Sequence, residues 1–211
     1  CIRDSVHTQY SLFDGMCRIL DMVSRAKELD MPAVAITDHG NMYGVIHLYK
    51  EALTQGIKPI LGCEVYMTRG SRMDHPAKER LCHLILLAKN NEGYHNLIKI
   101  VSKGFIDGEN NYHRPRVDYD LLKTYHRGLI ALSACIEGQI QQDLINRNEA
   151  GARRALEELV SIFGKEDFYL EVQNHGLPEE KLVRHVFKDW AREYGLKLVA
   201  TNDYHYIVFY T

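Results

Sequence analysis

Short apolar runs alternate along this chain with segments whose apolar residues recur every three to four positions. The short runs are typical of buried strands, and the 3.6-residue repeat is typical of amphipathic helices. The pattern predicts a first strand ending at His7 and further strands at 33–36, 60–66, 83–87, 129–132, 168–172 and 198–201. It predicts helices at about 19–29, 45–53, 94–101, 137–163 and 178–195, the fourth interrupted near Asn148, and a loop at 104–118.

About seven strand-then-helix steps therefore follow one another. Repeated units of this kind imply a parallel sheet covered by helices. The chain has no glycine fingerprint of a dinucleotide-binding fold. We therefore predict an α/β fold in which the sheet closes, or nearly closes, into a barrel, with residues 1–211 forming a single domain.

Composition narrows the class of protein. The 211 residues are 45% hydrophobic, enough for one sizeable core. No apolar run approaches the roughly 18 residues of a membrane span, and residues 1–5 show no secretory signal. Five scattered cysteines without a CxxC pair favour a reducing compartment. We therefore expect a cytoplasmic protein that does not bind a membrane.

The net charge of -2 is not that of a general nucleic-acid binder. If DNA is a ligand, bound metal ions or a neighbouring domain must help to hold it.

Side chains with metal-binding chemistry recur at the ends of the predicted strands, where a βα barrel carries its functional groups. These candidates are His7, Asp14, His39, Glu64, His83, Cys135, Asp203 and His205. Imidazole, carboxylate and thiolate groups bind zinc, manganese or iron. A carboxylate such as Glu64 can bridge two ions, and two or three ions a few ångströms apart would bind a phosphate and activate water. The pattern predicts a metal centre.

Each candidate taken alone has a simpler interpretation. A histidine before a glycine, such as His39, is more often a turn residue or a satisfied core group. Cys135 could be a small buried apolar group, and Asp14 before Gly15 could cap a turn. The prediction therefore depends on the recurrence of all eight candidates. Gln173 and His175, after the sixth strand, could line the same pocket or lie on the surface.

Six segments also resemble, in colinear order, the motifs of the PHP (polymerase and histidinol phosphatase) domain found at the amino end of bacterial DNA polymerase III alpha subunits. The segments are 7–15, 35–41, 56–66, 83–90, 132–135 and 200–206. The resemblance implies a distorted (β/α)7 barrel (the PHP fold) with two to three divalent metal ions, such as zinc, manganese or magnesium, at the strand ends.

The resemblance also implies a role for each candidate. One ion would be bound by His7, Glu64 and Asp203, a second by Glu64, His83 and Cys135, and a third by Asp14, His39 and His205. Family members with an intact cluster are associated with 3′–5′ exonuclease proofreading, whereas others have lost ligands and keep the domain as a scaffold. The family's first ligand is a histidine two residues before His7, where this chain has Ser5. We therefore expect the ion nearest His7 to be weakly bound.

Nothing in the chain resembles a polymerase palm, thumb or fingers. We therefore expect a fragment of a longer DNA-directed DNA polymerase, whose polymerising carboxylates lie in a later domain. The expected partners are those later domains and, through the full-length polymerase, the primer 3′ end of DNA.

Two alternatives stay open. A free-standing PHP phosphoesterase, such as a histidinol-phosphate phosphatase, would use the same metals, although segments 10–15, 58–66 and 114–118 favour the polymerase branch. A non-enzymatic interaction module would be consistent with Ser5.

Overall fold

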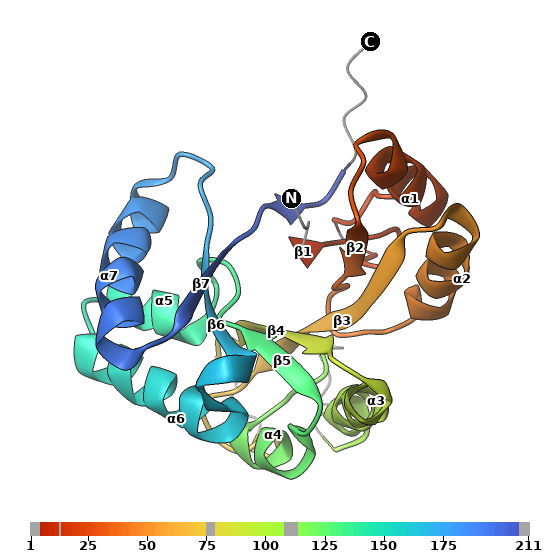
Figure 1. Cartoon of the computed structure of the whole chain (residues 1–211). Coiled ribbons are helices and arrows are strands. Elements are labelled where there is room, and N and C mark those ends of the chain that lie inside the picture. Colours follow the sequence, from red (N-terminus) through yellow and green to blue (C-terminus); the bar gives the residue numbers. More distant parts are fainter. Residues whose placement is uncertain (1–4, 13, 75–78, 108–113, 207–211) are drawn as a thin grey trace.

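The computed structural model describes residues 5–12, 14–74, 79–107 and 114–206. Among these residues one curled sheet and one short ladder of strands form the centre of the molecule (Figure 1). The sheet contains, in spatial order, β2 (Ala33–Ile36), β3 (Lys58–Met67), β4 (Cys82–Ala88), β5 (Leu129–Leu132), β6 (Phe168–Val172) and β7 (Lys197–Ala200). The ladder pairs β1 (Ser5–Val6) with β8 (Asp203–Tyr204).

The β1–β8 ladder connects the two edges of the sheet. β8 follows β7 after two residues and runs parallel to β1, with Ser5 opposite Asp203. β1 in turn bonds to the end of β2, because the Thr37 backbone N–H donates to the Val6 carbonyl at 3.0 Å. The Val6 N–H donates to Thr37 Oγ1 at 2.9 Å. The strands therefore form a distorted ring, and the predicted α/β barrel is confirmed.

The prediction of a parallel sheet is wrong for one strand. β4 runs antiparallel to both β3 and β5, whereas the other neighbouring pairs in the sheet are parallel. A parallel neighbour requires a long crossover, usually a helix. The described residues between β3 and β4 contain no helix, so the chain turns back directly. The start of β4, with His83, consequently lies at the same edge as the carboxyl ends of the parallel strands.

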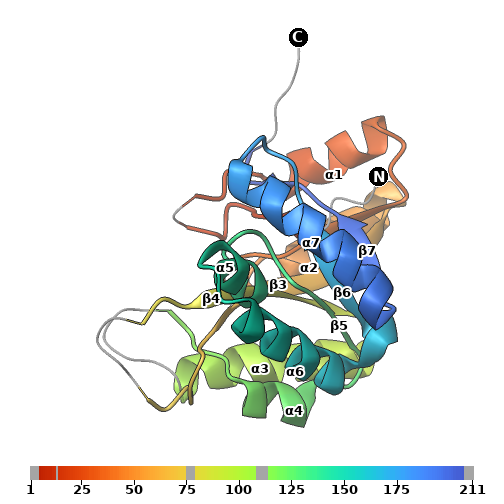
Figure 2. The ribbon, with the colours of Figure 1, turned by 90° about the vertical axis from the view of Figure 1, so that its left-hand side faces the viewer.

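The helices cover the outside of the curled sheet (Figures 1 and 2). They are α1 (Ile19–Glu28), α2 (Val45–Gln55), α3 (Asn91–Ile106), α4 (Tyr119–Tyr125), α5 (Gln139–Ile145), α6 (Glu149–Asp167) and α7 (Pro178–Tyr194). α1 and α2 pack on β2 and β3, while α6 and α7 pack on β5 to β7. None of the helices in the described segments is long and apolar enough to cross a membrane.

Local signals explain where several helices begin and end. Gly56 and Gly195 end α2 and α7 in the left-handed conformation that glycine adopts readily. The Asn148 side chain accepts a hydrogen bond from the Gly151 N–H, so it starts α6 and separates it from α5 as predicted. The predicted loop at 104–118 is shorter than expected, because α3 continues to Ile106; residues 108–113 lie outside the described residues.

The barrel interior changes from apolar to polar along β4. Ile85 and Leu87 pack with Leu132 in a small inner cluster, separate from the larger core between sheet and helices. Side chains two residues apart on a strand face the same side, so His83 lies on the inner face above Ile85. In the β3–β4 ladder Ile85 pairs with Glu64 and His83 pairs with Tyr66. The inner cluster therefore closes one end of the barrel, and polar side chains line the other end, which we call the mouth.

Candidate metal centre

Glu64 lies at the middle of a group of imidazoles in the mouth. Its Oε1 is 2.8 Å from His39 Nδ1 and 2.7 Å from His83 Nδ1, and its Oε2 is 3.7 Å from His7 Nε2. The Glu64 side chain is only 1% exposed. One buried carboxylate from β3 is thus close to imidazoles that follow β1, follow β2 and begin β4.

Asp203 and His205 extend this group from the other side of the mouth. Asp203 Oδ1 lies 3.1 Å from His7 Nε2 and 3.3 Å from His205 Nε2. Asp14 joins them from the loop after β1, with its Oδ2 3.2 Å from His39 Nε2 and its Oδ1 3.6 Å from His205 Nδ1. Glu64 and Asp203 both approach the same His7 nitrogen, so the two carboxylates belong to one group of side chains.

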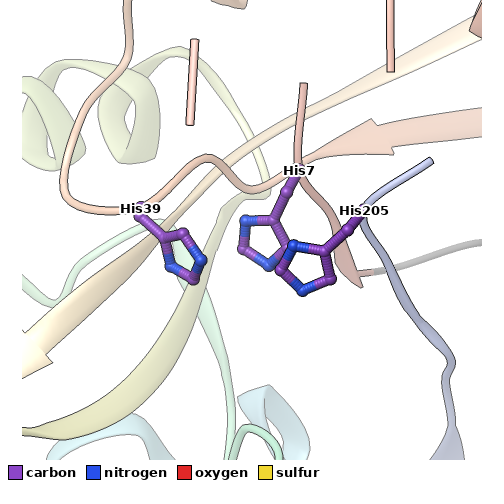
Figure 3. Close-up of side chains that lie close together, drawn as sticks. All are labelled: His7, His39 and His205. Carbon is purple, nitrogen blue, oxygen red and sulfur yellow. The ribbon is translucent and has the colours of Figure 1, made fainter. Parts of the chain in front are cut away.

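Three of the imidazoles stack on one another (Figure 3). The ring of His7 lies between the other two, with its centroid 3.9 Å from that of His39 and 4.5 Å from that of His205. One nitrogen from each ring falls within 4.8 Å of the other two, close enough for a shared ion. This trio takes one residue from the first predicted ligand group and two from the third.

Cys135 completes the set on the β5 side. Its Sγ lies 3.9 Å from His83 Nδ1. Burial, with Glu64 and Asp203 nearby, raises the pKa of the Cys135 thiol well above its usual range. In the metal-free chain Cys135 is therefore a protonated thiol at neutral pH, and binding as a thiolate would release that proton. The structure thus brings all eight predicted residues to one mouth; their roles as ligands stay a prediction.

The donor atoms in the mouth fit a metal ion. In the described segments, four buried atoms lie close to an ionisable neighbour but without the geometry of a hydrogen bond: His7 Nε2, His39 Nδ1, Glu64 Oε1 and His205 Nδ1. Buried polar atoms without hydrogen bonds cost free energy and call for an explanation. Imidazole nitrogen, carboxylate oxygen and sulfur are together the ligand set of zinc and related transition metals.

The charges in the mouth stabilise one another. Burial alone would raise the pKa of Glu64, but the imidazoles of His83, His39 and His7 outweigh it and hold that pKa well below its usual value. Burial likewise opposes protonation of His39, yet Glu64 and Asp14 raise its pKa to about 9. Without metal, the centre therefore contains an ionised Glu64 beside a protonated His39 at neutral pH.

Sequence reasoning missed the residues that support the loop after β1. Asp38 is buried, and its carboxylate accepts hydrogen bonds from the Thr8 N–H at 2.6 Å, the Thr8 hydroxyl at 2.8 Å and the Ser11 hydroxyl at 2.9 Å. Ser11 Oγ also accepts from the His39 N–H at 3.1 Å. The sequence did contain a signal for Asp38, because this residue lies between Thr37 and His39 at the end of a predicted strand. This network holds His7 and His39 next to each other.

A second buried carboxyl, Glu171 on β6, was also missed. Its Oε1 accepts hydrogen bonds from Gln173 Nε2 at 3.1 Å and from the Thr201 hydroxyl. Its backbone N–H donates to Ser133 Oγ at 2.9 Å. Glu171 therefore joins the ends of β5, β6 and β7, close to Cys135 and Asp203.

Gln173 and His175 were expected either to line the pocket or to lie on the surface, and the structure places them differently. Gln173 is buried and bonds Glu171 and Thr201, so it belongs to the inner wall of the barrel. His175 is exposed, and its N–H donates to Glu180 Oε2 at 2.7 Å at the start of α7. His175 is thus a surface residue at a helix start. The backbone of Ser5, in contrast, pairs with Asp203 directly beside the candidate metal centre.

Known relatives share much of the sequence of this chain. DNA polymerase III subunit alpha of Thermus aquaticus is 44% identical over 207 residues, which are 95% of this chain and 17% of that protein. The same subunit of Deinococcus radiodurans is 42% identical over 211 residues, or 95% of this chain and 16% of that protein. The chain thus spans about a sixth of the length of these relatives.

Solved structures show the same fold at low sequence identity. A Bifidobacterium adolescentis protein described as a metal-dependent phosphoesterase matches with a TM-score of 0.63 and 14% identity, over 97% of this chain and 87% of that one. An amidohydrolase from Chromobacterium violaceum matches over the same shares with a TM-score of 0.56 and 14% identity. The sequence model of the PHP domain matches residues 5–175. The chain therefore belongs to the PHP domain family.

Proposed function

We propose that this chain is the PHP domain of a bacterial DNA polymerase III alpha subunit, and that its mouth hydrolyses phosphodiester bonds at the primer 3′ end with divalent metal ions. The identity to polymerase subunits over 95% of the chain supports the first part. The position of buried Glu64 within 4 Å of three imidazoles carries the second part. On this proposal residues 1–211 form one domain of a longer cytoplasmic replication protein, and the polymerising residues lie outside it.

The eight candidates would hold the ions in three overlapping groups. The proposed groups are His7, Glu64 and Asp203; Glu64, His83 and Cys135; and Asp14, His39 and His205. Bound divalent ions supply Lewis acidity, a nucleophile at neutral pH and stabilisation of the leaving oxygen. This donor set suits zinc better than manganese or magnesium, because it includes imidazole and thiol groups.

The chain's own residues prepare the site for this chemistry. The imidazoles keep Glu64 ionised, so its two oxygens can serve two ions at once. Asp38 and Ser11 fix the His7 and His39 segments, which limits the rearrangement needed on binding. His39, protonated without metal, would lose its proton on loading, so loading should weaken as pH falls.

Metal analysis combined with a nuclease assay tests this proposal. We expect the purified chain to hold about two to three divalent ions and to release nucleotides from a labelled primer with a mismatched 3′ end. Glu64→Gln should lose most of the metal and the release, whereas Glu179→Gln, an exposed carboxylate on α7, should lose neither. Equal metal content and equal release in wild type and Glu64→Gln would contradict it.

Structural support of the polymerase is the second candidate function. Ser5 is the observation that favours it, because a hydroxyl is a poor metal ligand at the position where the family has a histidine. A wild-type chain that binds no metal and releases no nucleotide would support this second function. A free-standing phosphoesterase is less well supported, since the matching phosphoesterase fold is only 14% identical.

A further inference from the structure

The arginines near the β3–β4 connection differ in whether they form an ion pair with a carboxylate. Four of them are paired with carboxylates: Arg69 with Asp143, Arg72 with Asp118, Arg80 with Glu137 and Arg116 with Glu79. Arg114 is exposed and makes no ion pair with any residue in the described segments. One guanidinium beside this acidic, histidine-rich mouth thus has no carboxylate partner among the described residues.

Arg114 is held against an aromatic ring of the mouth. Its Cζ lies 5.2 Å from the ring centroid of Tyr66, within the range of a cation–π contact. The same ring is edge-on to His83, with centroids 5.3 Å apart, and lies 6.1 Å from the ring of His39. Tyr66 is therefore shared between the candidate metal centre and Arg114.

Backbone contacts fix the chain at Val117, three residues after Arg114. The Val117 N–H donates to the Tyr66 carbonyl at 2.9 Å, and the Thr68 N–H donates to the Val117 carbonyl at 2.9 Å. The segment thus continues alongside the end of β3. An arginine on such a support loses less conformational freedom on binding a ligand than one on an unpaired loop.

Gly40 allows this segment to approach the mouth. Its φ is +63°, and a β-carbon placed there would lie 2.8 Å from Pro115 Cγ and 3.1 Å from Tyr66 Cε2. Only glycine permits this close packing of Pro115 and Tyr66 on the residue that follows His39. The position of Arg114 is therefore tied to the segment that carries a candidate ligand.

From these contacts we infer that Arg114, supported on Tyr66, forms an anion subsite beside the candidate metal centre that binds a phosphate flanking the reacting one in single-stranded nucleic acid. This subsite rests on the proposed hydrolysis of phosphodiester bonds. The planar guanidinium donates two parallel hydrogen bonds to phosphate oxygens, a geometry that lysine lacks. Arg114 is not a metal-ligand residue type and forms no ion pair with Glu64 or Asp14 in the described structure, so it lies outside the donor set of the ions.

Tyr66 suits the role of support. The face of its ring carries the negative part of the aromatic quadrupole, which attracts a guanidinium such as that of Arg114. This arrangement also supplies the local positive charge that the overall net charge of -2 lacks.

Binding of a fluorescent single-stranded oligonucleotide, followed by anisotropy with and without EDTA, tests the subsite. A gel after each titration verifies that the oligonucleotide is intact. We expect Arg114→Gln to weaken binding at least about tenfold, the scale of a charged hydrogen bond, with unchanged metal content. Arg114→Lys should recover part of the loss. The control Arg192→Gln removes an exposed arginine from α7 and should bind like wild type.

Oligonucleotides with one neutral methylphosphonate locate the phosphate that is bound. At the linkage next to the terminal one, the substitution should weaken wild-type binding as much as Arg114→Gln does, and should have no further effect on that variant. Equal binding by wild type and Arg114→Gln, additive losses at every linkage, or a wild type that does not bind would overturn the subsite. The measured quantity is binding and not hydrolysis. A chain that does not hydrolyse the oligonucleotide but binds it through Arg114 would therefore contradict the proposed hydrolysis and support the subsite.

Discussion

Glu64 and Glu171 are both fully buried carboxyls on inner strands of the same sheet, yet their surroundings act on them in opposite directions. Three imidazoles approach Glu64 and hold its pKa well below the usual value. Among the described residues, Glu171 accepts hydrogen bonds from a hydroxyl and an amide, of Thr201 and Gln173, and burial together with the charges of Glu64 and Asp203 raises its pKa to about 7. The difference lies in the charge of the neighbours, because both carboxyls are equally shielded from water.

This difference teaches which buried carboxyl can serve metal ions. Desolvation disfavours the anion, and cationic neighbours can outweigh it, whereas neutral donors compensate only in part. Glu64 is therefore an anion before any metal arrives, and a bound cation would replace the proton on His39. Glu171 is partly protonated near neutral pH and serves to join the ends of three strands.

The largest effect should follow from removing the Glu64 charge. In EDTA at pH 6, Glu64→Gln should lower the free energy of unfolding by about 3–5 kcal/mol, because protonated His39 loses its buried partner. The measurement is a urea titration followed by circular dichroism.

The pH dependence gives this first prediction its control. The pKa of His39 is raised from 6.5 to about 9, so its stabilising effect is fully present below pH 6.5 and lost as the pH rises through 9. The difference between wild type and Glu64→Gln should therefore shrink above pH 9. A difference that stays constant across this window would contradict the pairing of Glu64 with His39.

The opposite result is expected for Glu171→Gln. The pKa of Glu171 is raised from 4.5 to about 7, so the stability contributed by its protonated form is fully present below pH 4.5 and lost as the pH rises through 7. Glutamine cannot ionise. Relative to wild type, the variant should gain up to about 3 kcal/mol of unfolding free energy between pH 4.5 and pH 8.5.

Urea titrations in EDTA at the two pH values would measure that gain. Comparing the change with pH, and not the absolute stability, cancels any cost of placing an amide among the Thr201 and Gln173 donors. If the two proteins respond to pH in parallel, Glu171 is not the buried acid described above.

A smaller effect, on metal binding and not on folding, is expected at Cys135. Cys135→Ser should lower the affinity for zinc about tenfold or more, a scale typical for the loss of a partner in a metal site. The unfolding midpoint in EDTA should hardly change, because Cys135 lies after β5 and outside the main core. Competition with a zinc-binding dye would measure the affinity, and an affinity equal to that of wild type would show that Cys135 is not a ligand.

The smallest change is expected from Ser5→His, which adds a ligand type beside a site that already has most of its donors. Metal occupancy should rise, mainly for the ion nearest His7, and any phosphodiester hydrolysis should rise with it. Metal analysis of both proteins after dialysis against the same zinc buffer would measure the gain. No gain in either quantity would favour a role as structural support.

Much of this fold follows from local patterns. The strands at 33–36, 129–132 and 168–172 have the predicted bounds because short apolar runs between helices leave little choice. The direction of β4 could not be predicted in the same way. Seven strands in alternation favoured a parallel sheet, and only the lack of a predicted helix between the strands at 60–66 and 83–87 indicated the reversal.

The candidate metal centre was predicted more completely than its surroundings. Its eight members carry the residue types of metal ligands and stand at strand ends, so sequence position alone indicates their convergence. Glu171, Tyr66 and Arg114 show no such signal. The role of a buried acid depends on which hydrogen-bond donors from other strands lie next to it. The role of an arginine depends on whether a carboxylate lies close enough to pair with it. Such information appears only once the chain is folded.

The short β1–β8 ladder has a consequence for the order in which the chain folds during its synthesis. Ser5 pairs with Asp203, so this contact joins residues that are 198 positions apart, and closing so long a loop is slow and costs conformational entropy. During synthesis His7 leaves the ribosome long before Asp203 and His205. The first part of the chain can therefore fold around α1 and α2 while the donor set stays incomplete. Metal capture should accordingly be a late event that marks a finished barrel.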